Sequence, residues 1–392
     1  MNKFLLALAL AIPPTLSIAE IWDGPNHPGN FRRLMGTNLV MTFSDLPLSG
    51  KLADDRMGWA EAFWPSNKGG IAYRWNHPDP QPFKYKLHSF NELKQMSEEQ
   101  ISRLSPAELY DIASGDYNYT LTRKTLSLYS PRDLWWEGIC HGWAQAATQY
   151  AEPAPITIVN KDGIRVPFGS SDVKALLSMH ESYNYKGEPF GFVGRRCAVN
   201  GKVQGQELNG DTHPFPPSPE LANTPECRDA NAGATHVVMS NMLGLLGKGF
   251  VAEVDRFNDV WNQPIVRYDS KIVQEEPVTE SHRAQGIARR VRIKTDFVYS
   301  EELLFPSARA RELGYTNFVS KQPVTLTPAQ EYVTKKYEYI LEIDSADRII
   351  GGEWISETRP DFIWNYKKAK NFKNSPIPLA NLRFIYKPIR RY

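Results

Sequence analysis

The fold of this 392-residue chain is predicted above all from one segment, WWEGICHGWAQAA (residues 135–147). From Cys140 onward the segment is rich in alanine, which predicts a helix that ends before Pro153. At the point where a loop turns into a helix, unpaired N–H groups and the helix dipole favour a thiolate and can bind an oxyanion. Cys140 is therefore the candidate nucleophile, and a buried, inert thiol is the alternative.

The neighbours of Cys140 fit a substrate cleft. Trp136 and Trp143 are predicted to wall the cleft, and Gly138 and Gly142 are expected to let a substrate backbone approach closely.

Segments further from Cys140 predict a mixed fold. The runs SEEQ (residues 97–100) and SPAE (residues 105–108) are capping boxes that begin helices. Another helix is expected over residues 172–183, and residues 337–354 predict a β-hairpin. We predict an α+β fold in which the Cys140 helix lies beside a mainly antiparallel sheet, after an irregular N-terminal region.

The N-terminus has the pattern of an export signal. Residues 1–19 combine a basic start, a short apolar run and a small-residue cleavage site, and no later segment reaches the ~20 apolar residues of a transmembrane helix. We expect a secreted or periplasmic protein that is cleaved near Ala19. The predicted divisions are an N-terminal region over 20–94, a catalytic domain over 95–365 and a C-terminal extension over 366–392.

The charge balance gives no reason to propose nucleic acid or a membrane surface as a partner, because 46 Lys and Arg stand against 44 Asp and Glu. The sequence leaves the oligomeric state open. Three cysteines are an odd number for an exported protein, so we expect a disulfide between Cys197 and Cys227 and a leftover thiol at Cys140. No Cys/His spacing or acidic loop predicts a metal site.

A cysteine nucleophile needs a base and a group that orients the base. His141 projects about 100° away from Cys140 around a helix and is a poor partner. His236 opens an apolar segment and is the better candidate, with a structural histidine as the alternative. The strand that follows carries three acids, any of which could hold the imidazole: Glu253, Asp255 and Asp259.

Five segments resemble, in order, blocks of the transglutaminase elicitor family of oomycete and bacterial proteins: CHGW (140–143), NAGATH (231–236), VWNQPIVR (260–267), IIGGEW (349–354) and PDFIW (360–364). The third segment closely resembles the family's elicitor peptide. The second has Ala232 where the family usually has proline.

This resemblance implies a papain-like cysteine-enzyme core and an acyl transfer. Cys140 would attack the carboxamide of a protein-bound glutamine, release ammonia and form a thioester. A lysine amine would then take the acyl group and form an isopeptide bond. His236 would act first as base and then as acid, oriented by Asp255, with Asp259 as the second choice.

The resemblance also assigns Trp261 and Pro264 to the cleft. Related transglutaminases can need calcium, which this sequence leaves open. Two other functions compete. One is a cysteine peptidase or glutamine deamidase that passes the acyl group to water, and the other is a non-catalytic surface module that kept the fold.

Overall fold

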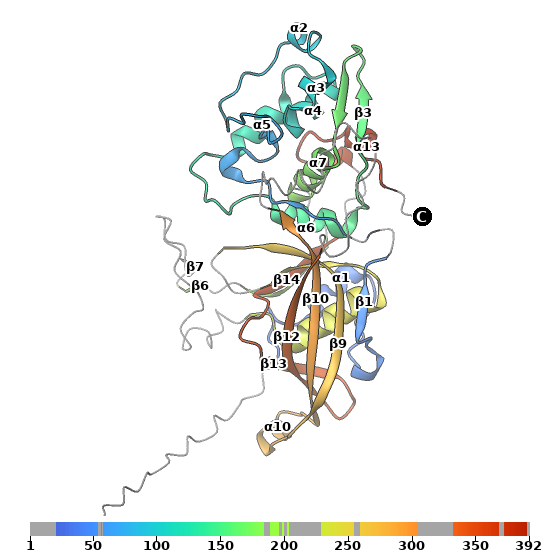
Figure 1. Cartoon of the computed structure of the whole chain (residues 1–392). Coiled ribbons are helices and arrows are strands. Elements are labelled where there is room, and N and C mark those ends of the chain that lie inside the picture. The colour runs from blue at the N-terminus through green and yellow to red at the C-terminus, as the bar shows by residue number, and fades with distance from the viewer. Residues whose placement is uncertain are drawn as a thin grey trace, which may run out of the picture.

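A computed structural model describes residues 21–53, 56, 58–183, 189–195, 198–199, 202–203, 229–254, 259–303, 332–367 and 372–389. The molecule has a helical part and a large sheet, which meet at helix α6 (Cys140–Gln149; Figure 1). Each part has its own hydrophobic cluster, and Cys140 belongs to the cluster of the helical part. The candidate nucleophile therefore lies at the junction of the two parts.

The helical part consists mainly of short helices with well-defined starts. It contains α2 (Phe90–Leu93), α3 (Glu98–Ile101), α4 (Pro106–Ala113), α5 (Thr120–Leu128), α7 (Ser170–Tyr183) and α13 (Leu382–Ile385), the 3-10 turns η4 (Ser66–Lys68), η5 (Gly70–Ala72) and η8 (Phe372–Asn374), and the hairpin of β3 (Ile156–Val159) and β4 (Arg165–Phe168). Both predicted capping boxes are present. The Ser97 hydroxyl accepts the N–H of Gln100, and the Ser105 hydroxyl accepts that of Glu108. The predicted helices after Cys140 and over 172–183 are α6 and α7.

The second part is an antiparallel sheet that has eight strands in the described residues. Its order is β13-β12-β10-β9-β8-β14-β5, and β1 is added beside β9. Its strands are β1 (Ser49–Lys51), β5 (Phe190–Gly194), β8 (Phe250–Glu253), β9 (Asn262–Glu276), β10 (Arg289–Ser300), β12 (Tyr332–Ile343), β13 (Ile349–Trp354) and β14 (Phe362–Tyr366). Strands β12 and β13 are the predicted hairpin, and Asp347 in its turn adopts a φ of +60°. The mixed helical and antiparallel architecture confirms the coarse α+β prediction.

Helices cover both faces of this sheet. Helix α9 (Ala232–Met239), continued by a π-helix (Ser240–Leu245), packs on β12 and β13, whereas α6 packs on β8 and β9. In β8, Val251 packs with Ala144 of α6, but its neighbour Ala252 belongs to the cluster that contains α9. Because side chains alternate between the two faces of a strand, the sheet separates α6 from α9.

Helix α9 approaches β13 closely because glycines meet at the contact. A Cβ atom on Gly233 would lie 2.1 Å from the carbonyl oxygen of Gly351. The side chain of Asn231, which caps α9, also donates to the carbonyl oxygen of Gly352 at 2.9 Å. Two of the five family-like segments therefore contact each other, and this contact fixes α9 on the sheet.

The N-terminal residues are distributed over both parts. The 3-10 turns η1 (Pro28–Phe31) and η2 (Phe43–Asp45) and helix α1 (Arg32–Met35) lie with the sheet, while β2 (Glu61–Ala62) pairs in parallel with β11 (Glu302–Leu303). The remaining short elements are β6 (Ala198–Val199), β7 (Lys202–Val203) and α10 (Glu280–Ala284). Trp59 and Trp64, on either side of β2, are buried in the helical part. This arrangement brings residues from before the predicted catalytic domain close to Cys140.

Candidate active site

Cys140 is the first residue of α6, as the sequence predicted. The preceding residue, Ile139, donates its N–H to the carbonyl oxygen of Phe63 at 2.7 Å. A Cβ atom on Gly138 would lie 2.4 Å from that same oxygen. The loop that leads into α6 is therefore held tightly against the segment that follows β2.

Gly142 has a similar packing role on the other side of α6. A Cβ atom there would lie 2.0 Å from the hydroxyl of Ser182 and 2.1 Å from the carbonyl oxygen of Ser178, both in α7. We expected Gly138 and Gly142 to make room for a substrate backbone. In the structure they make room for neighbouring protein segments, and so fix the position of Cys140.

The sulfur of Cys140 contacts two residues that precede or begin β9. The side-chain amide of Asn262 donates to Sγ at 3.5 Å, and the backbone of Asn262 also hydrogen-bonds the sulfur. The thiol donates to the carbonyl oxygen of Val260 at 3.7 Å. On its far side, Asn262 Oδ1 accepts the indole N–H of Trp364 at 2.8 Å. The hydrogen bonds from Asn262 favour the thiolate, whereas the carbonyl oxygen of Val260 accepts the thiol proton and favours the neutral thiol.

The closed surroundings of Cys140 keep its thiol protonated. The side chain is only 5% exposed, and burial raises the pKa of the thiol to about 12. The carboxylates of Glu302 and Glu253 raise this pKa further, while the hydrogen bonds from Asn262 lower it. Burial also raises the pKa of Glu302 to about 8, against the hydrogen bond that it accepts from Gln263 at 2.7 Å. We expected the helix terminus to favour the thiolate, but in the closed pocket burial raises the pKa of the thiol.

A pocket of about 400 Å³ opens beside Cys140. In the described part of the chain its lining holds the candidate nucleophile, one histidine, two carboxylates and no lysine or arginine: Ser66, Leu128, Tyr129, Asp133, Trp136, Glu137, Gly138, Cys140, His141, Val260 and Asn262. Burial lowers the pKa of His141 to about 4, while a hydrogen bond with the backbone of Ser182 acts in the opposite direction. His141 is therefore neutral at pH 7, and in the closed pocket it is a weaker base than an ordinary imidazole.

His236 lies on the other face of the sheet. It belongs to α9, its Nδ1 is 2.7 Å from the hydroxyl of Tyr339, and its ring packs near that of Phe43. Burial lowers the pKa of His236 to about 3. Because the sheet separates α6 from α9, the structure does not bring the predicted base to Cys140. The contacts of His236 are those of a residue that joins α9 to β12.

The structure describes two of the three acids predicted to orient His236, Glu253 and Asp259. Glu253 lies on the Cys140 side of the sheet, where its carboxylate accepts the N–H of Trp261. Asp259 lies in the loop directly before Val260. Asp255 falls outside the described residues, so its role stays a prediction.

The predicted disulfide also falls outside the described residues, because Cys197 and Cys227 both do. Within them, Cys140 is not part of a disulfide. No group of three or more His, Cys, Asp or Glu side chains in the described ranges is arranged to hold a metal ion. None of the helices in those ranges has both the length and the apolar character that a membrane span needs.

The four residues predicted to shape the cleft have different environments. Trp136 lines the pocket. Trp261 is half-buried and its ring lies 5.7 Å from that of the exposed Trp135. Trp143 is fully buried in the helical core, where its indole N–H donates to a backbone carbonyl. Pro264 is buried within β9. The structure therefore brings Trp136 to the pocket and puts Trp143 in the core.

Most of the pocket lining was not predicted from the sequence, and two of the missed residues, Asn262 and His141, are the ones to which we assign chemical roles. Asn262 lies inside the elicitor-like segment, next to Trp261. Its polar side chain, in a segment that resembles the family, could have marked it as a candidate site residue. His141 was set aside because successive residues diverge around a helix. At the first turn of α6, however, both Cys140 and His141 lie at the helix end where the pocket opens.

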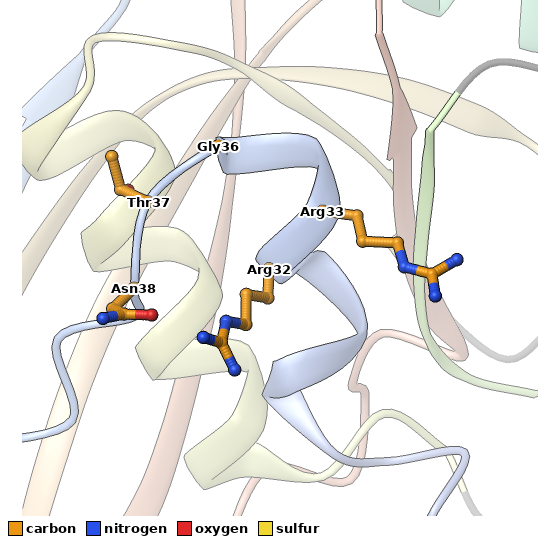
Figure 2. Close-up of a pocket in the computed structure, with 5 residues that line it drawn as sticks. All are labelled: Arg32, Arg33, Gly36, Thr37 and Asn38. Carbon is orange, nitrogen blue, oxygen red and sulfur yellow. The ribbon is translucent and has the colours of Figure 1, made fainter.

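A second hollow, of about 610 Å³, lies at α1 beside α9 (Figure 2). Figure 2 shows the side chains of Arg32 and Arg33 pointing in different directions, with Thr37 and Asn38 on the loop after Gly36. This hollow is lined by none of the residues predicted to act in catalysis. The candidate chemistry therefore lies in the Cys140 pocket.

Comparisons with known proteins give the family of the chain. The model of the transglutaminase elicitor family matches residues 133–379, which is more than half of the chain and includes α6, β8, β9 and β14. In fold, the chain is similar to the crystal structure of the GP42 transglutaminase from Phytophthora sojae, with a TM-score of 0.61 and 20% sequence identity, over 93% of this chain and 97% of that one. No curated protein matches the chain. The chain belongs to the transglutaminase elicitor family.

Proposed function

We propose that this protein is a transglutaminase that joins glutamine and lysine side chains of protein substrates through a thioester on Cys140. The observation that carries the proposal is the position of Cys140 at the start of α6, within hydrogen-bonding distance of Asn262 and beside His141 at a pocket. The sulfur attacks the carboxamide carbon of a glutamine, the C–N bond breaks, and ammonia leaves. A lysine amine then attacks the thioester, the C–S bond breaks, and an isopeptide bond remains.

In this proposal the proton passes through His141 and not through His236. Neutral His141 takes the thiol proton and gives it to the leaving nitrogen as ammonia forms. It then takes a proton from the attacking amine and returns one to the sulfur of Cys140. In the closed pocket the carbonyl oxygen of Val260 accepts the thiol proton. A substrate that enters and displaces this contact removes that acceptor, which makes it easier for the thiol to lose its proton.

The charge of the pocket supports an amine as the acyl acceptor. Asp133 and Glu137 line it, and no lysine or arginine does so in the described chain. Carboxylates attract an alkylammonium group, and the rings of Tyr129 and Trp136 offer faces on which such a cation binds. This composition favours a cationic acyl acceptor over water.

A papain-like core is part of the same proposal. Its support is the packing of the Cys140 helix on the antiparallel strands β8 and β9. We also propose, on the pattern of residues 1–19, that the protein is exported to meet its protein substrates.

The test is the incorporation of a fluorescent primary amine into casein by wild type and by Cys140→Ala, with and without calcium. We expect incorporation by the wild type and none by the variant, and the calcium arm decides whether the ion is required. Ammonia release without incorporation would replace the transferase with a glutamine deamidase, and new peptide termini would replace it with a peptidase. A wild type that is inactive in all three assays would favour a non-catalytic module.

A further inference from the structure

We propose that Asn262 is a catalytic residue that donates hydrogen bonds to the reacting sulfur and to the oxyanion, and that Trp364 is the positioning residue that fixes its amide. The oxyanion role rests on the proposed function. The contact with the sulfur does not, because it concerns the ionisation of Cys140 alone.

The orientation of the Asn262 amide follows from the chemistry of its neighbours. An indole N–H can only donate a hydrogen bond, so the atom of Asn262 that lies 2.8 Å from Trp364 Nε1 is the amide oxygen. The amide nitrogen then faces the other way and lies 3.5 Å from Cys140 Sγ. Trp364 thereby directs the amide nitrogen of Asn262 towards the nucleophile.

The sheet places these residues on one face. Strand β8 lies between β9, which begins with Asn262, and β14, which carries Trp364. Trp364 is paired with Val251, and Asn262 is paired with Glu253, two residues further along β8. Directly paired residues and residues two apart share a face. The indole therefore reaches across β8 on the side that faces α6.

The hydrogen bond between Trp364 and Asn262 is protected from water. Asn262 is 7% exposed and Trp364 is 8% exposed. The indole also stacks on Tyr366, with ring centroids 6.0 Å apart, and packs in a cluster with Ala144 of α6. A buried hydrogen bond between packed groups has few competitors, so the amide is held in one orientation before substrate arrives.

A fixed amide serves both states of the reaction. One of its protons stabilises the thiolate, and the second can bind the oxyanion that forms when the sulfur attacks the glutamine carbonyl. Without the indole N–H the amide can turn by 180° and present its oxygen to the sulfur. That arrangement repels both the thiolate and the oxyanion, which makes orientation as important as the presence of Asn262.

The test compares Trp364→Phe and Asn262→Ala with a matched control, Trp354→Phe. The Trp364→Phe substitution keeps an aromatic ring and removes the indole donor. Trp354 also donates its indole N–H to a buried partner, the carbonyl oxygen of Ala230 at 2.7 Å, but it packs with the α9 cluster. Alkylation of Cys140 by iodoacetamide is measured over a pH series with peptide mapping, and kcat and KM are measured for amine incorporation.

We expect Trp364→Phe and Asn262→Ala to move the Cys140 alkylation profile to higher pH. We expect kcat to fall by about 10²-fold in Asn262→Ala and by a smaller factor in Trp364→Phe, with KM for the glutamine donor nearly unchanged. Trp354→Phe should change neither readout. A folded Trp364→Phe or Asn262→Ala with the wild-type alkylation profile would overturn the proposal, and so would an equal shift in the control. A shifted profile in a protein that incorporates no amine would retain the sulfur contact and reject the transferase instead.

Discussion

Cys140 and His236 lie on opposite faces of one antiparallel sheet. The first begins α6, which packs on β8 and β9, and the second belongs to α9, which packs on β12 and β13. Instead, Nδ1 of His236 lies 2.7 Å from the hydroxyl oxygen of Tyr339, and this oxygen lies 2.8 Å from the hydroxyl oxygen of Thr295. His236 thus has the environment of a structural residue, whereas His141, next to the nucleophile, lines the pocket.

This arrangement predicts different effects for two histidine substitutions. His141→Gln removes the proposed proton carrier, so we expect kcat for amine incorporation to fall by about 10²- to 10⁴-fold in a protein of normal stability. His236→Phe leaves the buried Tyr339 hydroxyl with one partner fewer, so we expect the protein to lose about 1–3 kcal/mol of stability while the folded fraction stays active. Thermal melts and activity per folded molecule separate the two. Loss of activity in a folded His236→Phe, with His141→Gln active, would return the base to His236.

The buried His236 also predicts a pH dependence of stability. Its pKa is lowered from 6.5 to about 3 by burial. Between these values the unfolded chain binds a proton that the folded chain does not, so stability falls as the pH falls through this window. His236→Phe removes this contribution. The loss of unfolding free energy that the substitution causes should therefore be about 2 kcal/mol smaller at pH 5 than at pH 7. An equal loss at both pH values in urea titrations would show that His236 is not held neutral.

Gly142→Ala is expected to disturb the junction between α6 and α7. Its Cβ atom would meet the carbonyl oxygen of Ser178 at 2.1 Å, and a backbone atom cannot move aside as a side chain can. We expect a loss of about 1–3 kcal/mol in stability, as for other overpacked sites, with reduced amine incorporation because Cys140 moves with α6. Gly24→Ala is the control, because a Cβ atom there would meet nothing within 4 Å. Equal melting temperatures for the two variants would contradict the close contact.

The acidic lining of the pocket predicts a preference for cationic acceptors. Asp133 and Glu137 accept backbone N–H groups of Ser130 and Leu134, and Asp133→Asn and Glu137→Gln keep these oxygen acceptors while removing the charge. We expect each variant to raise KM for a primary alkylamine by about two- to fivefold, the range of partly exposed ion pairs. Hydroxylamine, which is uncharged at neutral pH, should keep its KM. Equal changes for both acceptors would mean that the carboxylates do not recognise charge.

Local features of the fold were predictable from the sequence, whereas the set of residues that come together at the Cys140 pocket was not. The capping boxes at Ser97 and Ser105 depend on residues three apart, and the start of α6 depends on its own composition. The placement of His236 depends on which face of the sheet α9 covers, and the order of residues along the chain does not carry that information. Trp364 and Asn262 are 102 residues apart in the sequence, and the sheet order alone brings them together.

The most direct test of the Cys140 thioester is peptide mapping after incubation with a small glutamine donor and an acid quench. The account predicts that the peptide containing Cys140 gains the mass of the donor minus ammonia, and that adding a primary amine before the quench removes this adduct as the isopeptide product appears. Product that accumulates while Cys140 stays unmodified, or while Cys140→Ala remains active, would contradict it.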